Sequence, residues 1–187
     1  IFMAVSKALY KSATLRADGA DIGRLMSVAN AEVSRDNQEM LFVTAFAGIL
    51  DLDTGELSYC NAGHDNPYLI DPSQVTLRRL DDGDGPPLCA LSEFDYQGGR
   101  CVMRPGELLC VITDGVGEAQ DPAGALYGGE RVEAMLTRLG RGAATARSVV
   151  EALQADVGVF VAGAEPADDL TILALRWQGP GARAPTS

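Results

Sequence analysis

Short apolar runs separated by glycine- and proline-containing turns fill the middle of the chain and restrict the possible folds more than any other feature. The runs at 41–52 and 57–63 flank the turn Asp-Thr-Gly-Glu, which predicts a β-hairpin. Further strands are predicted at 66–71, at 100–113, where two runs flank Pro105-Gly106, and at 169–177.

Apolar residues at helical spacing lie on both sides of this series of strands. They predict helices at 1–17, 21–36, 129–140 and 144–161. Asp18-Gly19 is expected to end the first helix, and Asp21 can cap the second. The predicted inner face of the second helix consists of Ile22, Leu25, Met26, Ala29 and Val33. Residues 81–91 and 114–128 are predicted as loops, and the whole order predicts an α+β fold with helices packed against antiparallel sheet.

The charge of the chain limits its partners. Its 187 residues include 26 acidic and 15 basic ones, for a net charge of −11. Binding to nucleic acid or to an anionic membrane surface depends on Lys and Arg, so neither partner is predicted. Hydrophobic residues make up 47% of the chain, which excludes a disordered protein. No apolar run is long enough to span a membrane. An acidic protein that handles phosphate would need a cation in between.

Several other features have structural explanations. The four cysteines, Cys60, Cys89, Cys101 and Cys110, form no C-x-x-C pair, so free thiols in a reducing cytoplasm are predicted and a zinc site is not. The segment from Asp51 to Gly55 is partly similar to a calcium loop, but the EF-hand spacing fails and a hairpin turn is favoured. Trp177, the single tryptophan, is predicted to pack at the end of the last strand.

Two groups of carboxylates lie at predicted strand ends. Asp114-Gly115 directly follows the apolar run 108–113, and Asp168-Asp169 directly precedes the run 170–175. Adjacent carboxylates repel each other unless a cation or a donor intervenes. These residues could be turn or helix-capping residues, or they could be oxygen ligands of a hard cation. The amino-acid types alone leave both explanations open.

Four motifs in series give the chain a family resemblance. The segments LFVTAFAGILDLDTGELSYCNAGHDNPYLI, GPPL, ELLCVITDGVGEAQDPAGALYGGER and ADDLTILALR occur in this order. In their order and spacing they resemble the metal-dependent protein serine/threonine phosphatases of the protein phosphatase 2C (PP2C) type, and within these the bacterial SpoIIE/RsbU branch. The resemblance implies an α-β-β-α sandwich of two antiparallel sheets flanked by helices.

The resemblance also implies a centre of two Mg²⁺ or Mn²⁺ ions that activates water to hydrolyse phosphoserine or phosphothreonine. Asp114 and Asp168 match metal-binding, and hence catalytic, aspartates of the family. Asp169 is a further metal candidate, but a residue that supports a neighbouring ligand or caps the strand is favoured over a direct ligand. Gly115 is expected to shape the turn beside the ligand, and Thr113 to orient it.

The motif Asn-Ala-Gly-His contributes Asn61, Gly63 and His64, the single histidine of the chain. His64 could lie near the phosphate or act as a general acid. The alternative is a residue that fixes the loop by hydrogen bonds, as Asn61 is expected to do, and this alternative is favoured because metal-activated water needs no imidazole.

The sequence also departs from the family pattern. Gly117 stands where the family has Thr, and Asp65-Asn66 stand where it often has Pro. The chain opens inside what corresponds to the family's first helix, so the first acidic motif and the N-terminal strands are expected to lie upstream. Otherwise the protein is a degenerate phosphatase. Residues 1–178 are predicted as the phosphatase domain, incomplete at its N-terminus, and 179–187 as a flexible tail.

The resemblance finally implies the partners. The expected substrate is a phosphorylated anti-sigma-factor antagonist of a partner-switching pathway, and the expected regulator is an upstream sensor or receiver domain in the same or another chain. A homodimer is compatible with these expectations. A non-catalytic module that binds a signalling partner is the alternative function.

Overall fold

A computed structural model describes the chain except for residues 1–20, 36, 38, 143, 165–167 and 182–187. The predicted helix at 1–17 and its stop at Asp18-Gly19 therefore lie outside the described residues, as does most of the predicted tail. Within the described part, no helix combines the length and apolar character needed to cross a bilayer.

The chain divides into two compact units, each built around one sheet. The first unit contains the described residues of Ile1–Asp51, together with Glu56–His64 and Asp81–Val102. The second contains Leu52–Gly55, Asp65–Leu80 and the described residues of Met103–Ser187. Both sheets are mostly antiparallel and carry helices, which confirms the predicted α+β class.

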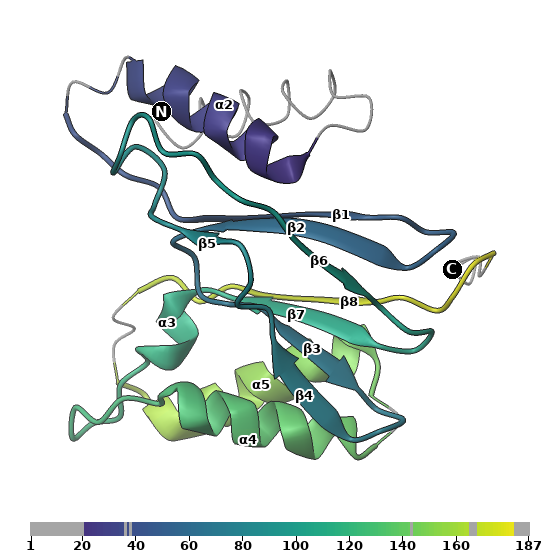
Figure 1. Cartoon of the computed structure of the whole chain (residues 1–187). Coiled ribbons are helices and arrows are strands. Elements are labelled where there is room, and N and C mark those ends of the chain that lie inside the picture. The colour runs from purple at the N-terminus through teal and green to yellow at the C-terminus, as the bar shows by residue number, and fades with distance from the viewer. Residues whose placement is uncertain (1–20, 36, 38, 143, 165–167, 182–187) are drawn as a thin grey trace. The chain divides into compact units, whose positions relative to one another are not determined.

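The first unit pairs one long helix with a four-stranded sheet (Figure 1). Its elements are α2 (Ile22–Arg35), β1 (Ala45–Leu50), β2 (Glu56–Ala62), β5 (Asp84–Gly85) and β6 (Gly99–Val102). Strands β1 and β2 form the predicted hairpin, and β6 pairs with the other edge of β2. Helix α2 packs on β1 and β2 with its predicted face buried, and the Asp21 carboxylate caps it by accepting the Gly23 N–H at 3.0 Å.

The second unit has a sheet in the order β4-β3-β7-β8, in which every pair is antiparallel (Figure 1). Its elements are β3 (Tyr68–Asp71), β4 (Thr76–Arg79), β7 (Leu108–Ile112), α3 (Asp114–Gly117), α4 (Gly129–Gly140), α5 (Ala146–Val161) and β8 (Ile172–Arg176). Helices α4 and α5 cover one face of this sheet, and their apolar sides form a core with β7. Strand β7 lies in the interior of the sheet and is almost entirely buried, which holds its C-terminal end in a fixed position.

The predicted elements need correction in detail. Strand β4 was not predicted, because Leu77 is the single apolar side chain in Thr76–Arg79 and gives no alternating pattern. The predicted loop at 81–91 contains the two-residue strand β5, and the predicted loop at 114–128 begins with the short helix α3. The two runs around Pro105-Gly106 are strands as predicted, but they belong to different sheets, since β6 pairs with β2 and β7 with β3 and β8.

The structure agrees with two smaller predictions, the free cysteines and the packing of Trp177. All four cysteines lie in the described residues, and none of them forms a disulfide. Burial raises the pKa of Cys60 to about 11 and that of Cys110 to about 12, so both thiols stay protonated at neutral pH. The Trp177 side chain is buried, and its Nε1–H donates to the Leu52 carbonyl at 3.3 Å.

Candidate active site

The candidate site begins where β7 ends. Thr113 follows the strand in an extended conformation, and Asp114 is the first residue of α3. The Asp114 carboxylate accepts the Gly115 N–H through Oδ1 at 2.9 Å, and the side chain is exposed at the protein surface. The buried strand thus holds an aspartate in the rigid strand-end position that the sequence predicts.

Thr113 joins this turn to the segment that leads into β8. Its N–H donates to the Thr171 carbonyl at 3.1 Å, and its Oγ1 accepts the Thr171 N–H at 3.0 Å. The same hydroxyl donates to the Asp169 carbonyl at 3.3 Å. These contacts extend the β7–β8 pairing beyond the sheet, so the two acidic motifs lie side by side although more than fifty residues separate them.

Gly115 permits a close approach between the backbones of the two segments. A Cβ atom at this buried position would lie 2.5 Å from the Asp169 carbonyl oxygen and 3.0 Å from its carbon. Both contacts are to backbone, which cannot move aside like a flexible side chain. The turn therefore needs glycine because of space.

The three candidate metal ligands are exposed on this edge of the second unit. Asp168 accepts the Asp169 N–H through Oδ1 at 2.7 Å, the same type of bond that Asp114 makes with Gly115. Carboxylate oxygens are the ligands that Mg²⁺ and Mn²⁺ prefer, so the donor chemistry fits these ions. Among the described residues, however, no group of three or more Asp, Glu, His or Cys side chains is arranged to hold a metal. The turn at Asp114 and the Asp168-Asp169 pair thus fit part of a metal centre.

The Asn-Ala-Gly-His motif lies in the first unit, at the end of β2. The buried Asn61 side chain donates to the His64 carbonyl at 2.8 Å and accepts the His64 N–H at 2.9 Å. Gly63 has φ +70°, and a Cβ there would lie 2.6 Å from Pro87. Asn61 and Gly63 therefore shape this loop, as expected for Asn61, whereas a role of the half-buried His64 imidazole stays a prediction.

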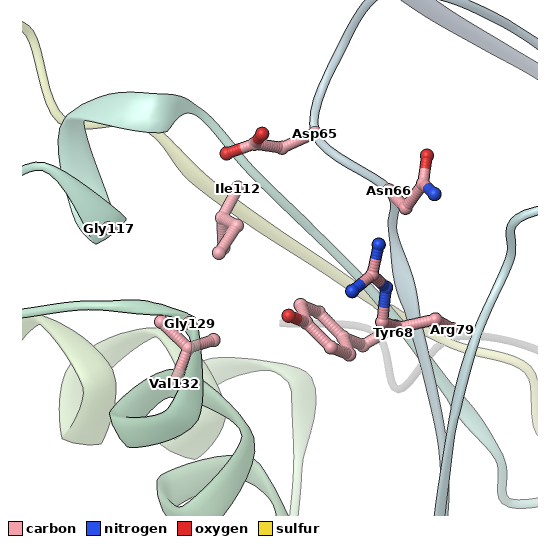
Figure 2. Close-up of a pocket in the computed structure, with 8 residues that line it drawn as sticks. All are labelled: Asp65, Asn66, Tyr68, Arg79, Ile112, Gly117, Gly129 and Val132. Carbon is pink, nitrogen blue, oxygen red and sulfur yellow. The ribbon is translucent and has the colours of Figure 1, made fainter. Parts of the chain in front are cut away.

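A pocket of about 220 Å³ opens in the second unit beside α3 and the start of α4 (Figure 2). Its lining residues are Asp65, Asn66, Tyr68, Arg79, Ile112, Gly117, Gly129 and Val132. The Tyr68 ring is buried, and its hydroxyl lies 3.5 Å from Glu133 Oε1, which is long for such a hydrogen bond. Burial, and next the Glu133 carboxylate, raise the pKa of Tyr68, so its hydroxyl stays protonated.

Sequence reasoning missed this pocket. Asp65 and Asn66 depart from the family pattern, but nothing in the sequence distinguishes Arg79. No helix or strand is predicted for the segment that contains it. Tyr68 was noted as part of a strand, and strand periodicity does not reveal which polar atom faces a cavity.

The loop after α3 is tied back to that helix. The Gly128 N–H donates to the Gly117 carbonyl at 2.9 Å, and the Tyr127 N–H donates to the Ala119 carbonyl at 2.8 Å. The buried Tyr127 hydroxyl donates to Asp156 Oδ2 on α5 at 2.7 Å, and burial, followed by this bond, raises the pKa of Tyr127. Tyr127 thus anchors the loop between α3 and α4 to the helical layer.

We expect Tyr127→Phe to lower the free energy of unfolding by about 1.5 kcal/mol, because it removes a hydrogen bond to a charged acceptor. Urea denaturation of Tyr127→Phe, Asp156→Ala and the double variant measures the coupling between the two side chains. A coupling of about 1 kcal/mol or more supports the anchor. Additive losses would show that the two side chains act independently.

Comparison with known proteins identifies a family. A family model described as Stage II sporulation protein E (SpoIIE) matches residues 1–178. The chain is also 26% identical over 149 residues to Protein IcfG of Synechocystis sp. (strain ATCC 27184 / PCC 6803 / Kazusa). This match covers 79% of the chain, and the chain spans 23% of the length of IcfG.

Solved structures agree in fold. The SiaA-PP2C domain of Pseudomonas aeruginosa has a TM-score of 0.74 at 20% identity, with 94% of this chain and 68% of that chain covered. The Mn-presoaked phosphatase domain of SpoIIE from Bacillus subtilis has a TM-score of 0.63 at 14% identity, with 98% and 75% covered. The two-sheet α+β architecture is therefore that of PP2C-type phosphatase domains.

Proposed function

This chain belongs to the SpoIIE family of PP2C-type phosphatase domains, and on that premise we propose that it is a metal-dependent phosphoprotein phosphatase. The observation that carries the proposal is the pairing of the two acidic motifs. Thr113 binds the backbone of Asp169 and Thr171, so the turn that carries Asp114 lies against the Asp168-Asp169 segment. Because the protein has a net charge of −11, a cation held by this acidic pair would offset the repulsion of an anionic substrate.

In this proposal each residue of the two paired motifs has a definite role. Asp114 and Asp168 hold Mg²⁺ or Mn²⁺ through their carboxylates, and Asp169 is either a further ligand or a support for one. A divalent ion bound there supplies Lewis acidity, which activates water and offsets the charge of the phosphate. Thr113 fixes the turn through its backbone N–H and its hydroxyl, and Gly115 lets the two segments approach.

The proposed substrate, the number of metal ions and the regulation rest on the resemblance to the family. The proposed substrate is a phosphoserine or phosphothreonine of an anti-sigma-factor antagonist in a partner-switching pathway of the cytoplasm. The proposed centre contains two ions, so it needs ligands in addition to those on the β7–β8 edge. A sensor or receiver domain, in the same or another chain, would control the enzyme, and a homodimer is compatible with this control.

A non-catalytic module that binds a signalling partner is the second candidate. The observation in its favour is that no group of three or more candidate metal ligands is assembled among the described residues. Such a module would keep the fold and the paired motifs without forming a complete metal centre.

Hydrolysis of a phosphoserine protein tests the proposal. The protein at its full natural length should release phosphate in the presence of Mn²⁺, lose this activity in EDTA and regain it when Mn²⁺ is restored. Calorimetric titration with Mn²⁺ separates the two candidates. Binding of two ions together with turnover supports the enzyme. A folded protein that binds no Mn²⁺ and releases no phosphate supports the module.

A further inference from the structure

The pocket between β3, β4, α3 and α4 has no role in the proposed reaction. It nevertheless lies close to the candidate metal ligand Asp114. Gly117 lines the pocket and is the last residue of α3, three residues after Asp114. One helical turn, about 5 Å along the axis, separates these two positions. A protein substrate that presents its phosphorylated residue to Asp114 would therefore place a neighbouring side chain at the pocket.

Hydrogen-bond donors line one part of the pocket. Figure 2 shows the Arg79 guanidinium and the Tyr68 hydroxyl directed into it. Within the described part of the chain, Arg79 takes part in none of the four ion pairs. Gly129 opens α4, and the preceding Gly128 has no side chain that could cap the helix. The first N–H groups of α4 therefore have no acceptor within the helix.

A carboxylate that can accept hydrogen bonds lies in the same pocket. The Asp65 carboxylate points into it in Figure 2, whereas Glu133, whose Oε1 lies 3.5 Å from the Tyr68 hydroxyl, is not among the lining residues. An ionised carboxylate can accept several hydrogen bonds at once. Asp65 and Arg79 are the charged residues in the lining, and Asp65 opposes the entry of a carboxylate while Arg79 opposes the entry of a cation. The ligand that suits this set is uncharged and carries both an acceptor and a donor.

The size and the walls of the pocket narrow the ligand further. A volume of about 220 Å³ is below the range typical of small-molecule sites, so the pocket suits a single side chain. Ile112, Val132 and the Tyr68 ring form apolar walls around an aliphatic stem. At Gly117 and Gly129 a Cβ would meet no atom within 4 Å, so the space beside both residues is open.

We propose that this pocket binds a carboxamide side chain, Gln or Asn, that lies close in sequence to the phosphorylated residue of the substrate. The carbonyl oxygen accepts from Arg79 and from the start of α4, and the NH₂ group donates to Asp65. The proposal rests on the phosphatase function and adds to it a determinant of substrate choice.

Phosphoserine peptides test this proposal. Gln, Glu or Leu is placed in turn at each of the three positions on either side of phosphoserine in an alanine background, and kcat/KM is measured with Mn²⁺. At one position we expect Gln to exceed both Glu and Leu by about tenfold, the effect of one or two net hydrogen bonds. Fluorescence anisotropy gives the Kd of the same peptides without turnover, so a failure of catalysis is distinguished from a failure of recognition.

Two variants should abolish the preference for Gln. Gly129→Leu places a side chain in the open space of the pocket, and Arg79→Gln removes the guanidinium. Both should reduce the ratio of Gln to Leu peptides to about one, which a general loss of stability would not do because it lowers both rates alike. The matched controls, Gly158→Leu on an open surface of α5 and Arg78→Gln beside Arg79, should keep the wild-type ratio.

Equal kcat/KM and equal Kd for the three peptides at every position would overturn the proposal. A preference for Glu, or a Gln preference that survives in Gly129→Leu, would overturn it as well. Selective binding of the Gln peptide without any hydrolysis would support the recognition site and contradict the phosphatase function.

Discussion

Asp114→Asn and Asp168→Asn are each expected to lower Mn²⁺-dependent phosphoserine hydrolysis by about a thousandfold or more. Asparagine keeps the oxygen that accepts the next N–H, at Gly115 in one case and at Asp169 in the other. The local turn therefore survives, while the negative charge that binds a divalent ion is lost. Phosphate release from a phosphoserine peptide measures the first effect, and calorimetric titration with Mn²⁺ measures the loss of metal affinity.

Two further variants show whether the loss is specific to the proposed metal ligands. Asp81→Asn changes an exposed aspartate of the first unit and should keep the wild-type rate and metal affinity. Asp169→Asn separates the two assignments of that residue, since a direct ligand would cause a loss like that of Asp168 and a support would cause a smaller one. If Asp114→Asn retained full activity, the metal role of the β7–β8 edge would be refuted.

Gly115→Val is expected to lower the free energy of unfolding by about 3 kcal/mol and to abolish activity. Even the first added atom would lie 2.5 Å from the Asp169 carbonyl oxygen, and valine adds two methyl groups to it. The turn and the segment before β8 would have to separate. Such a separation would break the hydrogen bonds of Thr113 to Asp169 and Thr171. Urea denaturation and phosphate release measure the two effects.

Gly117→Ala is the matched control for stability. It lies in the same short helix, but its Cβ would meet no atom within 4 Å. This variant should unfold at a urea concentration equal to or slightly above that of the wild type, because alanine is the better helix former. If Gly115→Val were as stable as Gly117→Ala, the close packing between the two acidic segments would not exist in solution.

Local patterns were sufficient for most elements of the fold. The predicted inner face of α2 is buried because one side of a regular helix meets the sheet. The hairpin of β1 and β2 follows from two apolar runs around a short glycine-containing turn. Strand β4 was not predictable because its side chains are mostly polar and exposed. Hydrogen bonds to β3 hold it in the sheet.

The candidate site was predictable in its residues and less so in its geometry. The strand-end pattern and the family motifs predict Asp114 and Asp168 as metal ligands, and that role stays a prediction. Their sequence positions could not show that Thr113 bonds to both Asp169 and Thr171, since that contact requires β7 and β8 to be neighbours. The pocket was unpredictable for a similar reason, because Tyr68, Arg79 and Gly129 come from three separate elements.

By itself the sequence determined the period of each helix and strand, the glycines at the turns and the acidic motifs at the strand ends. These properties depend on residues within a few positions of one another, where hydrophobic spacing and backbone preferences act directly. Only the tertiary structure decided which strand ends meet, how closely Gly115 approaches Asp169, and that Arg79 lines a pocket with Tyr68. Such contacts join residues far apart in the chain, and they depend on the order of strands in the sheet and on the packing of helices against it.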